Sequence, residues 1–309
     1  MTSEPGTKDL RWMAAGMALL ALLGLVLWRY HQDPAKQLAF KATRVDLVSQ
    51  LQLGLAASAE AEKSAVLSVS DPESQAFADR ARTVTARMEK DRQELSRLLA
   101  SGGTQREREL LAQFSKAFDT LRQVDDEVLS LAVKNTNLKA YALLFGPATA
   151  ALGDVEGALA RLVTKRAASP DARQVILLAF TARVGLLHVQ MLLAPHIAEE
   201  SQPRMDQLEA SMREETRSAR EALDQLGRLP AFGGDADLAA AEAGFGRFVE
   251  LETRILALSR ENTNVRSLAL SLGQRRKAAL MCAEPLDALK QTILDEPIAG
   301  VSYGRLPTR

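Results

Sequence analysis

Residues 129–146 read LSLAVKNTNLKAYALLFG, and residues 256–273 read LALSRENTNVRSLALSLG. The triplet Asn-Thr-Asn stands at the same place in both stretches, 127 residues apart, and apolar residues align on either side of it without a gap. The same spacing aligns Glu73-Ser74-Gln75 with Glu200-Ser201-Gln202. Two separate matches at one spacing indicate an internal duplication, which constrains the domain organisation before any helix is assigned.

The composition is typical of long helices. Ala, Leu, Glu, Gln and Arg dominate the 309 residues, and aromatic residues make up only 5%, which disfavours sheets. The 39 basic and 39 acidic residues balance, so no global field attracts nucleic acid, and we expect no nucleic-acid partner. Cys282 is the only cysteine, which excludes an intramolecular disulfide, and its helical context predicts a small buried side chain.

Helix start and stop signals predict four helices in each copy of the duplication. Ser70-Asp71-Pro72 supplies an N-cap followed by a first-turn proline, and Gly102-Gly103-Thr104 breaks and restarts the chain. Pro147 should bend the fourth helix. We therefore predict an all-α fold with an N-terminal transmembrane helix and two tandem antiparallel four-helix bundles of coiled-coil type, at residues 32–167 and 168–296, followed by a mobile tail at 297–309.

A membrane anchor is predicted near the N-terminus. Residues 12–28 read WMAAGMALLALLGLVLW without a charge, and 17 helical residues rise about 25 Å, the lower limit for a hydrocarbon core of about 30 Å. A cleaved signal peptide is the alternative, but no small-x-small cleavage pattern follows. We expect residues 1–11 to be cytoplasmic, although basic residues are more frequent after the span, because a long domain translocates regardless of such charges.

A second apolar stretch, QVILLAFTARVGLLHVQMLLAP at residues 174–195, resembles another span in length. Its polar residues form two narrow stripes on a helical wheel, and Arg183 near its middle would be costly against lipid. We therefore interpret the stretch as a buried bundle helix. Because it is apolar on nearly all sides, it also suggests a dimer contact, and we expect a homodimer.

The repeated helices carry a family resemblance. The segment RENTNVRSLALSLGQRRKAALMCAEPLDAL (Arg260 to Leu289) and its echo VKNTNLKAYALLFGPATAAL (Val133 to Leu152) resemble the four-helix-bundle sensory domains of methyl-accepting chemotaxis receptors and related sensor kinases. The tandem arrangement is also similar to the helical bimodular sensors. The resemblance implies a single-pass protein of the bacterial inner membrane whose bulk is extracytoplasmic, and which binds a small organic ligand or a partner membrane protein.

The sequence departs from that family in two ways. The receptors continue into a second span and a cytoplasmic signalling region, whereas this chain stops at Arg309, so we expect it to act through a partner or by dimerising. The arginines that bind carboxylate ligands in the aspartate receptor have no matching positions here. No ligand assignment is therefore carried over from the family.

No catalytic residues, metal ligands or cofactor sites are predicted. The three histidines lack metal-binding spacing, and no glycine-rich phosphate loop or nucleophile elbow occurs. His196, next to Pro195, is expected at a turn as a cap or surface residue. The sequence therefore does not indicate an enzyme.

Five residues are candidates for ligand binding: Arg183, Asn135, Asn137, Asn262 and Asn264. The asparagines have an alternative role, since capping a turn between helices uses the same donors and acceptors. Arg183 offers a planar fork for a carboxylate, or equally for an acidic residue across the bundle. The run Arg275-Arg276-Lys277 is expected to be a solvated face rather than an anion site.

These observations predict a membrane-anchored extracytoplasmic sensory module of chemoreceptor type. The alternative is a structural helical spacer or an assembly scaffold of the cell envelope, with no ligand at all.

Overall fold

The structure is a computed structural model that describes residues 21–22, 34–230 and 234–298, and all regular structure in these ranges is helical. The elements are α2 (Pro34–Leu67), α3 (Asp71–Gly102), α4 (Gln105–Ala132), α5 (Thr136–Leu143), the π-helix η1 (Leu144–Ala148), α6 (Thr149–Arg166), α7 (Ala172–Ala198), α8 (Gln202–Gly227), α9 (Ala236–Glu261), α10 (Thr263–Leu270), the π-helix η3 (Ser271–Arg275) and α11 (Arg276–Asp295). The predicted all-α class is confirmed.

The predicted membrane anchor at residues 12–28 lies outside the described residues, except for Ala21 and Leu22, which are helical. The N-terminal segment 1–11 and the tail from residue 299 onward also lie outside them.

The chain forms two compact units, and neither is continuous in sequence. The described part of unit 1 comprises residues 21–22, 34–57, 83–120 and 278–298, and that of unit 2 comprises residues 58–82, 121–230 and 234–277. This differs from the division at residue 167 expected from the sequence. The physical reason is that α11 packs into unit 1, while α5 and α6 pack against α7 and α9 in unit 2.

Unit 1 contains an ion-pair cluster that links α2, α4 and the residues after α11. Arg44 on α2 donates to Glu107 on α4 at 2.7 Å and also pairs with Glu296, which follows α11. Glu107 also completes a capping box, because its carboxylate accepts from the Thr104 amide while the Thr104 hydroxyl accepts from the Glu107 amide. The predicted helix restart at Gly102-Gly103-Thr104 is therefore confirmed, and the capping box stabilises the first turn of α4.

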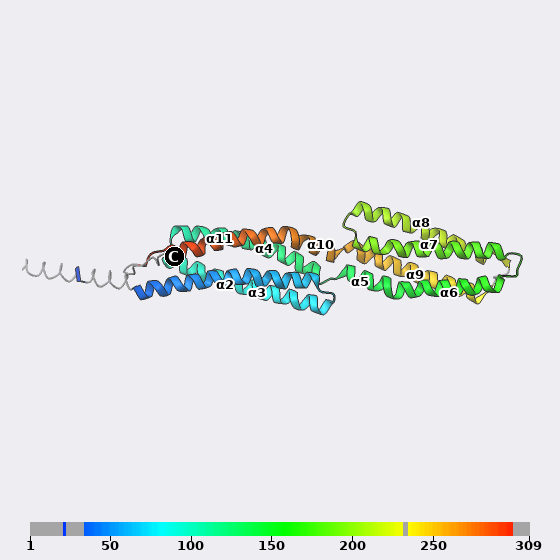
Figure 1. Ribbon diagram of the computed structural model, residues 1–309, viewed down its shortest axis with the longest axis horizontal. Coiled ribbons are helices and arrows are strands. Elements are labelled where there is room, and N and C mark those ends of the chain that lie inside the picture. The colour runs from blue at the N-terminus through cyan, green and yellow to red at the C-terminus, as the bar shows by residue number, and fades with distance from the viewer. Residues whose placement is uncertain (1–20, 23–33, 231–233, 299–309) are drawn as a thin grey trace, which may run out of the picture. The chain divides into compact units, whose positions relative to one another are not determined.

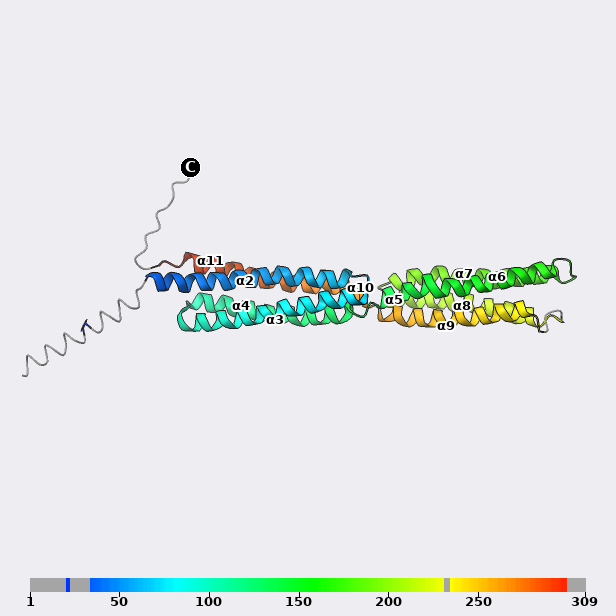
Figure 2. The same cartoon turned by 90° about the horizontal axis from the view of Figure 1, so that it is seen from below.

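In unit 2, helices α6 to α9 lie side by side (Figures 1 and 2). Short connections join α6 to α7, α7 to α8 and α8 to α9, so sequence neighbours run antiparallel. One continuous hydrophobic cluster between Ala140 and Ile255 forms their core. At Gly185 the α7 backbone approaches α8 so closely that an added Cβ would stand 2.9 Å from the Glu215 carbonyl oxygen.

Helix α7 contains the second apolar stretch. Among the described residues it is the one helix that is long and apolar enough to cross a membrane by length and composition. It nevertheless packs against α6, α8 and α9, and Val175, Ala182, Leu186, Val189 and Leu193 are buried in the core. This packing supports its interpretation as a bundle helix. The helix is less buried than expected, because Ile176, Leu177, Phe180 and Met191 are exposed.

Candidate functional site

The two Asn-Thr-Asn triplets meet in unit 2. Asn135 precedes α5 and Asn262 precedes α10, and both adopt the left-handed conformation, with φ of 50° and 51°. Asparagine tolerates this conformation better than other residues with a Cβ. Each triplet thus turns the chain sharply and starts a new helix, leaving the first amides of that helix without partners in their own turn.

Each triplet satisfies the amides of the other. The Thr136 amide donates to the Thr263 hydroxyl at 3.2 Å, and the Thr263 amide donates to the Thr136 hydroxyl at 3.1 Å. One residue further on, the Asn137 and Asn264 amides each donate to the other residue's side-chain oxygen at 3.1 Å. The two triplets therefore form a reciprocal cap between helices α5 and α10.

The remaining amide groups of the asparagines are used in the same network. Asn264 donates to the Asn135 side-chain oxygen at 3.0 Å, and Asn137 donates to that of Asn262 at 2.7 Å. Asn135 also donates to Asp71, and Asn262 to the Glu199 carbonyl oxygen. The structure thus brings together four of the five candidate residues, buried or half-buried, in hydrogen bonds that correspond to the capping alternative.

Arg183, the fifth candidate, lies elsewhere on unit 2. It is exposed on α7 and donates to Glu156 of α6 at 2.7 Å. The pair borders an open groove of about 700 Å³ between α6 and α7, which Ile176 and Phe180 line with exposed apolar side chains. Of the two roles that the sequence allowed for Arg183, the structure shows the ion pair with an acidic residue.

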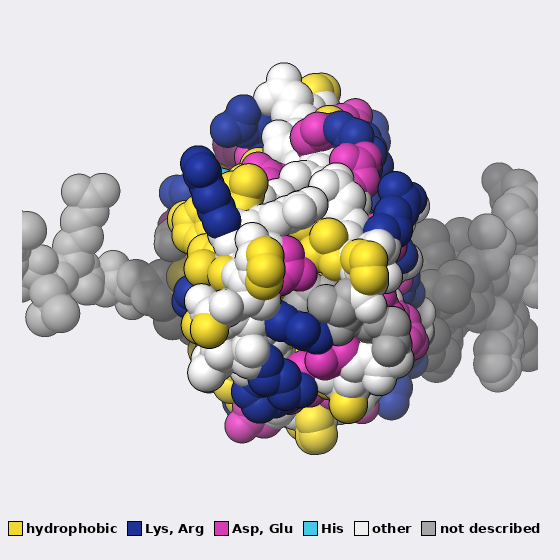
Figure 3. All heavy atoms as spheres, turned by 90° about the vertical axis from the view of Figure 1, so that its right-hand side faces the viewer, with side chains coloured by type: hydrophobic (Ala, Val, Ile, Leu, Met, Phe, Trp, Pro, Cys, Tyr) yellow, Lys and Arg dark blue, Asp and Glu magenta, His cyan; other side chains and the backbone are white. Residues whose placement is uncertain are grey.

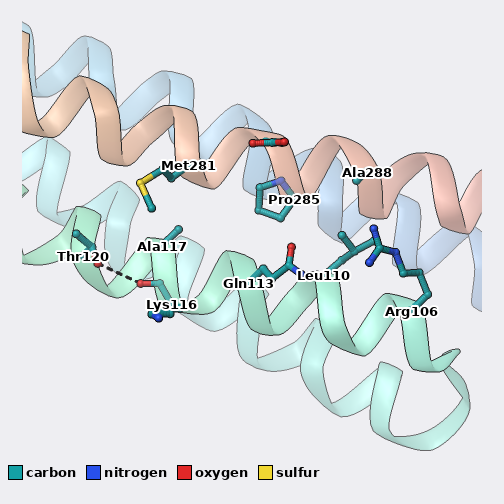
Figure 4. Close-up of a pocket in the computed structure, with 10 residues that line it drawn as sticks. Arg106, Leu110, Gln113, Lys116, Ala117, Thr120, Met281, Pro285 and Ala288 are labelled. Carbon is teal, nitrogen blue, oxygen red and sulfur yellow. Dashed lines mark hydrogen bonds between the residues drawn. The ribbon is translucent and has the colours of Figure 1, made fainter.

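A second groove lies in unit 1 between α4 and α11, with a volume of about 410 Å³ (Figure 4). Its floor is apolar, and Leu110, Ala117 and Pro285 are buried there. Pro285 lies inside α11 and has no N–H, so the Met281 carbonyl one turn earlier loses its usual helical donor.

The rim of this α4–α11 groove is polar. Arg106, Gln113 and Lys116 come from α4, and Glu284 comes from α11. Arg106 lies 4.0 Å from Glu109, whereas Lys116 has no ion-pair partner among the residues that the structure describes. An apolar floor with cations on the rim suits a small organic anion. Sequence reasoning missed this site, because no motif links α4 (Gln105–Ala132) to α11 (Arg276–Asp295), which is distant in sequence.

His196 lies in a buried cluster, and the expectation of a surface position at a turn is wrong. Helix α7 continues through Pro195 to Ala198, so the ring is enclosed between α7, α8 and α9. Its Nδ1 lies 2.8 Å from the Ser259 hydroxyl, and its Nε2 lies 3.0 Å from Glu209, which also accepts from Arg260. Burial lowers the pKa of His196, while Arg260 lowers the pKa of Glu209.

This serine, histidine and carboxylate do not form an accessible nucleophile site. Ser259 is fully buried, and its hydroxyl donates to the His196 carbonyl oxygen at 3.0 Å. The cluster ties three helices together, which is a structural role.

Charged side chains at one end of unit 2 pair across helices. Arg161 and Lys165 of α6 both pair with Asp237 in the first turn of α9. Figure 3 views the molecule from the end that carries the α6–α7 and α8–α9 connections, and basic, acidic and apolar side chains are interspersed there. The described side chains on this surface form no patch of a single charge.

Comparison with known proteins finds a family model that matches part of the chain. Residues 49–170 match the family described as a four helix bundle sensory module for signal transduction. No curated protein matches the chain. The matched range includes α4, which forms one wall of the α4–α11 groove. The other wall, α11, lies outside the matched range. The match confirms the resemblance to sensory four-helix bundles and indicates a sensory module for signal transduction.

Proposed function

We propose that the protein is a membrane-anchored extracytoplasmic sensory module that binds a small organic anion in the α4–α11 groove. The observation that carries this proposal is the combination of an apolar floor with the Lys116 ammonium on the rim, which has no ion-pair partner in the described part of the chain. The volume of about 410 Å³ lies within the range of small-molecule sites. The apolar run at residues 12–28 supports membrane attachment.

The test is a thermal-shift screen of the full-length protein in detergent against organic acids, amino acids and purines. A ligand that binds the folded state raises the melting temperature by mass action. Lys116→Glu should abolish the shift, and Lys90→Glu, at an exposed position on α3 of the same unit, should leave it unchanged. If no compound shifts the wild type, the structural spacer or scaffold is the better account.

The α6–α7 groove is a second candidate for a carboxylate ligand, since Arg183 presents a planar guanidinium there. A ligand at this position must displace Glu156. Arg183→Ala in the same screen distinguishes the two grooves, because it should remove only a shift that arises at α6–α7.

The protein is further proposed to form a homodimer through the outer face of α7. Ile176, Leu177, Phe180 and Met191 are large apolar side chains exposed on this helix. Such clusters are typical of protein contact sites. Sedimentation of the full-length protein in detergent should show a dimer that Phe180→Glu dissociates, and a monomeric wild type would contradict it.

Membrane sidedness is tested by reporter fusions at the C-terminus. A reporter that is active only outside the cytoplasm should be active, and activity of a cytoplasm-only reporter would contradict the extracytoplasmic placement.

A further inference from the structure

A buried charge cluster in unit 2 is used by none of the sites above. Arg275 of η3 donates to Asp125 of α4 at 2.9 Å and to the Ser58 hydroxyl at 3.1 Å. Its Nε lies 3.5 Å from a carboxylate oxygen of Glu62 on α2. The three charged side chains are buried, with 0% exposure for Glu62, 3% for Arg275 and 4% for Asp125. Three helical segments therefore meet at one guanidinium.

The charges of this Glu62–Asp125–Arg275 cluster do not balance. Two carboxyl groups share one cation, and neither oxygen of Glu62 has a hydrogen-bond partner. A buried carboxylate without partners is costly, and taking up a proton removes that cost. Asp125 receives the direct hydrogen bond from Arg275, so Glu62 is the carboxyl group of the two that takes up a proton more readily.

The groups around Glu62 do not supply the missing positive charge. Lys63 on α2 is exposed, and the neighbouring Asp126 on α4 is acidic. The Ser271 hydroxyl approaches the carboxyl without a hydrogen bond of good geometry. From α3, Ala78 and Ala81 enter the adjoining core, and the charged Asp79 and Arg82 are exposed and pair with each other.

The backbone at Arg275 is irregular in a way that the duplication repeats. The π-helix η3 spans Ser271–Arg275, and η1 spans Leu144–Ala148 at the equivalent place of the first copy. Ala148, the counterpart of Arg275, is fully buried without any charge. The fold therefore accommodates an apolar residue at this position, and a buried ion pair is seldom more stabilising than apolar packing. A π-helical segment often marks a functional position.

We propose that the Glu62–Asp125–Arg275 cluster is a proton-operated switch, in which loss of the proton from Glu62 loosens the packing of η3. Burial raises the pKa of both carboxyl groups above their ordinary values. Above the raised pKa, the cluster carries one uncompensated negative charge, and below it the charges balance. The packed state of η3 is thus favoured as the pH falls, whether or not a ligand binds elsewhere.

The test uses hydrogen–deuterium exchange of the full-length protein in detergent between pH 4.5 and 8.5, with the intrinsic pH dependence of exchange removed. Protection of residues 271–275 in the wild type should fall about tenfold or more as the pH rises. Glu62→Gln, which mimics the protonated acid, should keep the low-pH protection throughout. Glu60→Gln, at an exposed position two residues away, should follow the wild type.

An unchanged pH dependence in Glu62→Gln would overturn the proposal. If that variant fails to fold, infrared spectroscopy decides on a protein with native Glu62. The protein for this measurement carries isotope-labelled glutamate and the Glu252→Gln substitution. Its infrared spectrum should contain a carboxylic acid band from Glu62, and this band should disappear as the pH rises. Absence of that band at pH 4.5 would equally overturn it.

Discussion

At the scale of single residues, the Asn-Thr-Asn cap makes a prediction about coupling. Asn137→Ala leaves the Asn264 amide without its acceptor, and Asn264→Ala does the same to the Asn137 amide. Each single variant should lower the free energy of unfolding by about 1–3 kcal/mol. The double variant should cost clearly less than the sum, because both residues belong to one network.

Chemical denaturation of the four proteins in this double-mutant cycle measures the coupling. Thr253→Ala is the control, since its exposed hydroxyl bonds only to the Val249 carbonyl one turn earlier. It should change the free energy of unfolding by less than about 0.5 kcal/mol. Additive effects of the two asparagines would show that the caps act independently.

A second residue-scale prediction concerns Glu252, buried on α9 with the Thr216 hydroxyl as its hydrogen-bond donor. Burial raises its pKa from 4.5 to about 7, so the folded state holds a proton that the unfolded state releases between these values. Its contribution to stability is therefore greatest below pH 4.5 and is lost as the pH rises through 7. Glu252→Gln should gain on the order of 2–3 kcal/mol over the wild type between pH 5 and pH 8.

The measurement for Glu252 is the difference between variant and wild type in urea titrations at several pH values. The difference between the two proteins is needed because the wild-type stability also depends on His196. Burial lowers the pKa of His196 and favours the neutral ring, so its contribution to stability changes with pH in the opposite direction. Glu250→Gln, at an exposed position on the same helix, should show no such pH-dependent gain. A pH-independent effect of Glu252→Gln would mean that this carboxyl is ionised in the folded state.

At the scale of helices, two glycines with opposite surroundings give a matched pair. Gly185→Ala would place a Cβ 2.9 Å from the Glu215 carbonyl oxygen and force α7 away from α8, whereas a Cβ at Gly153 on α6 meets nothing within 4 Å. We expect Gly185→Ala to cost about 1–3 kcal/mol. Gly153→Ala should stabilise by about 0.5–1 kcal/mol through helix propensity. Thermal melts that rank the variants in the reverse order would contradict this packing.

Helix positions were predictable because their signals are local. The Ser70-Asp71-Pro72 cap begins α3 as expected, and the buried Cys282 lies within α11. The π-helix at Pro147 was expected only as a bend, and its counterpart η3 contains no proline at all. The burial of Arg275 was also missed, because in sequence it belongs to a charged run whose other members, Arg276 and Lys277, are exposed.

At the scale of the whole molecule, sequence reasoning placed the boundary at residue 167 by assuming that helices close in sequence pack together. That assumption holds for α6 to α9 and fails for α11, which packs in unit 1 although its first residue, Arg276, lies far beyond the end of α4 at Ala132. No local signal encodes such a return. The α4–α11 groove forms only because α11 packs against α4. The groove could therefore not be predicted from the sequence, although the helix α4 itself could.

The discontinuous units lead to a prediction about fragments. Every residue of the main hydrophobic cluster of unit 2 lies between Ala140 and Ile255, and α6 supplies Ala151, Val155, Ala158 and Leu162 to it. A fragment of residues 136–261 retains this cluster, so it should be helical and should melt cooperatively. A fragment of residues 168–296 lacks α6 and exposes the α9 surface that packs on it, and we therefore expect it to be partly unfolded or to aggregate.

Circular dichroism and calorimetry of the two fragments, which differ by only three residues in length, measure this directly. Val155→Asp in the 136–261 fragment is the control, since it places a charge in the same core and should abolish the cooperative transition. Cooperative melting of residues 168–296 alone would show that α7 to α9 form a stable bundle without α6, and would restore the contiguous division at residue 167.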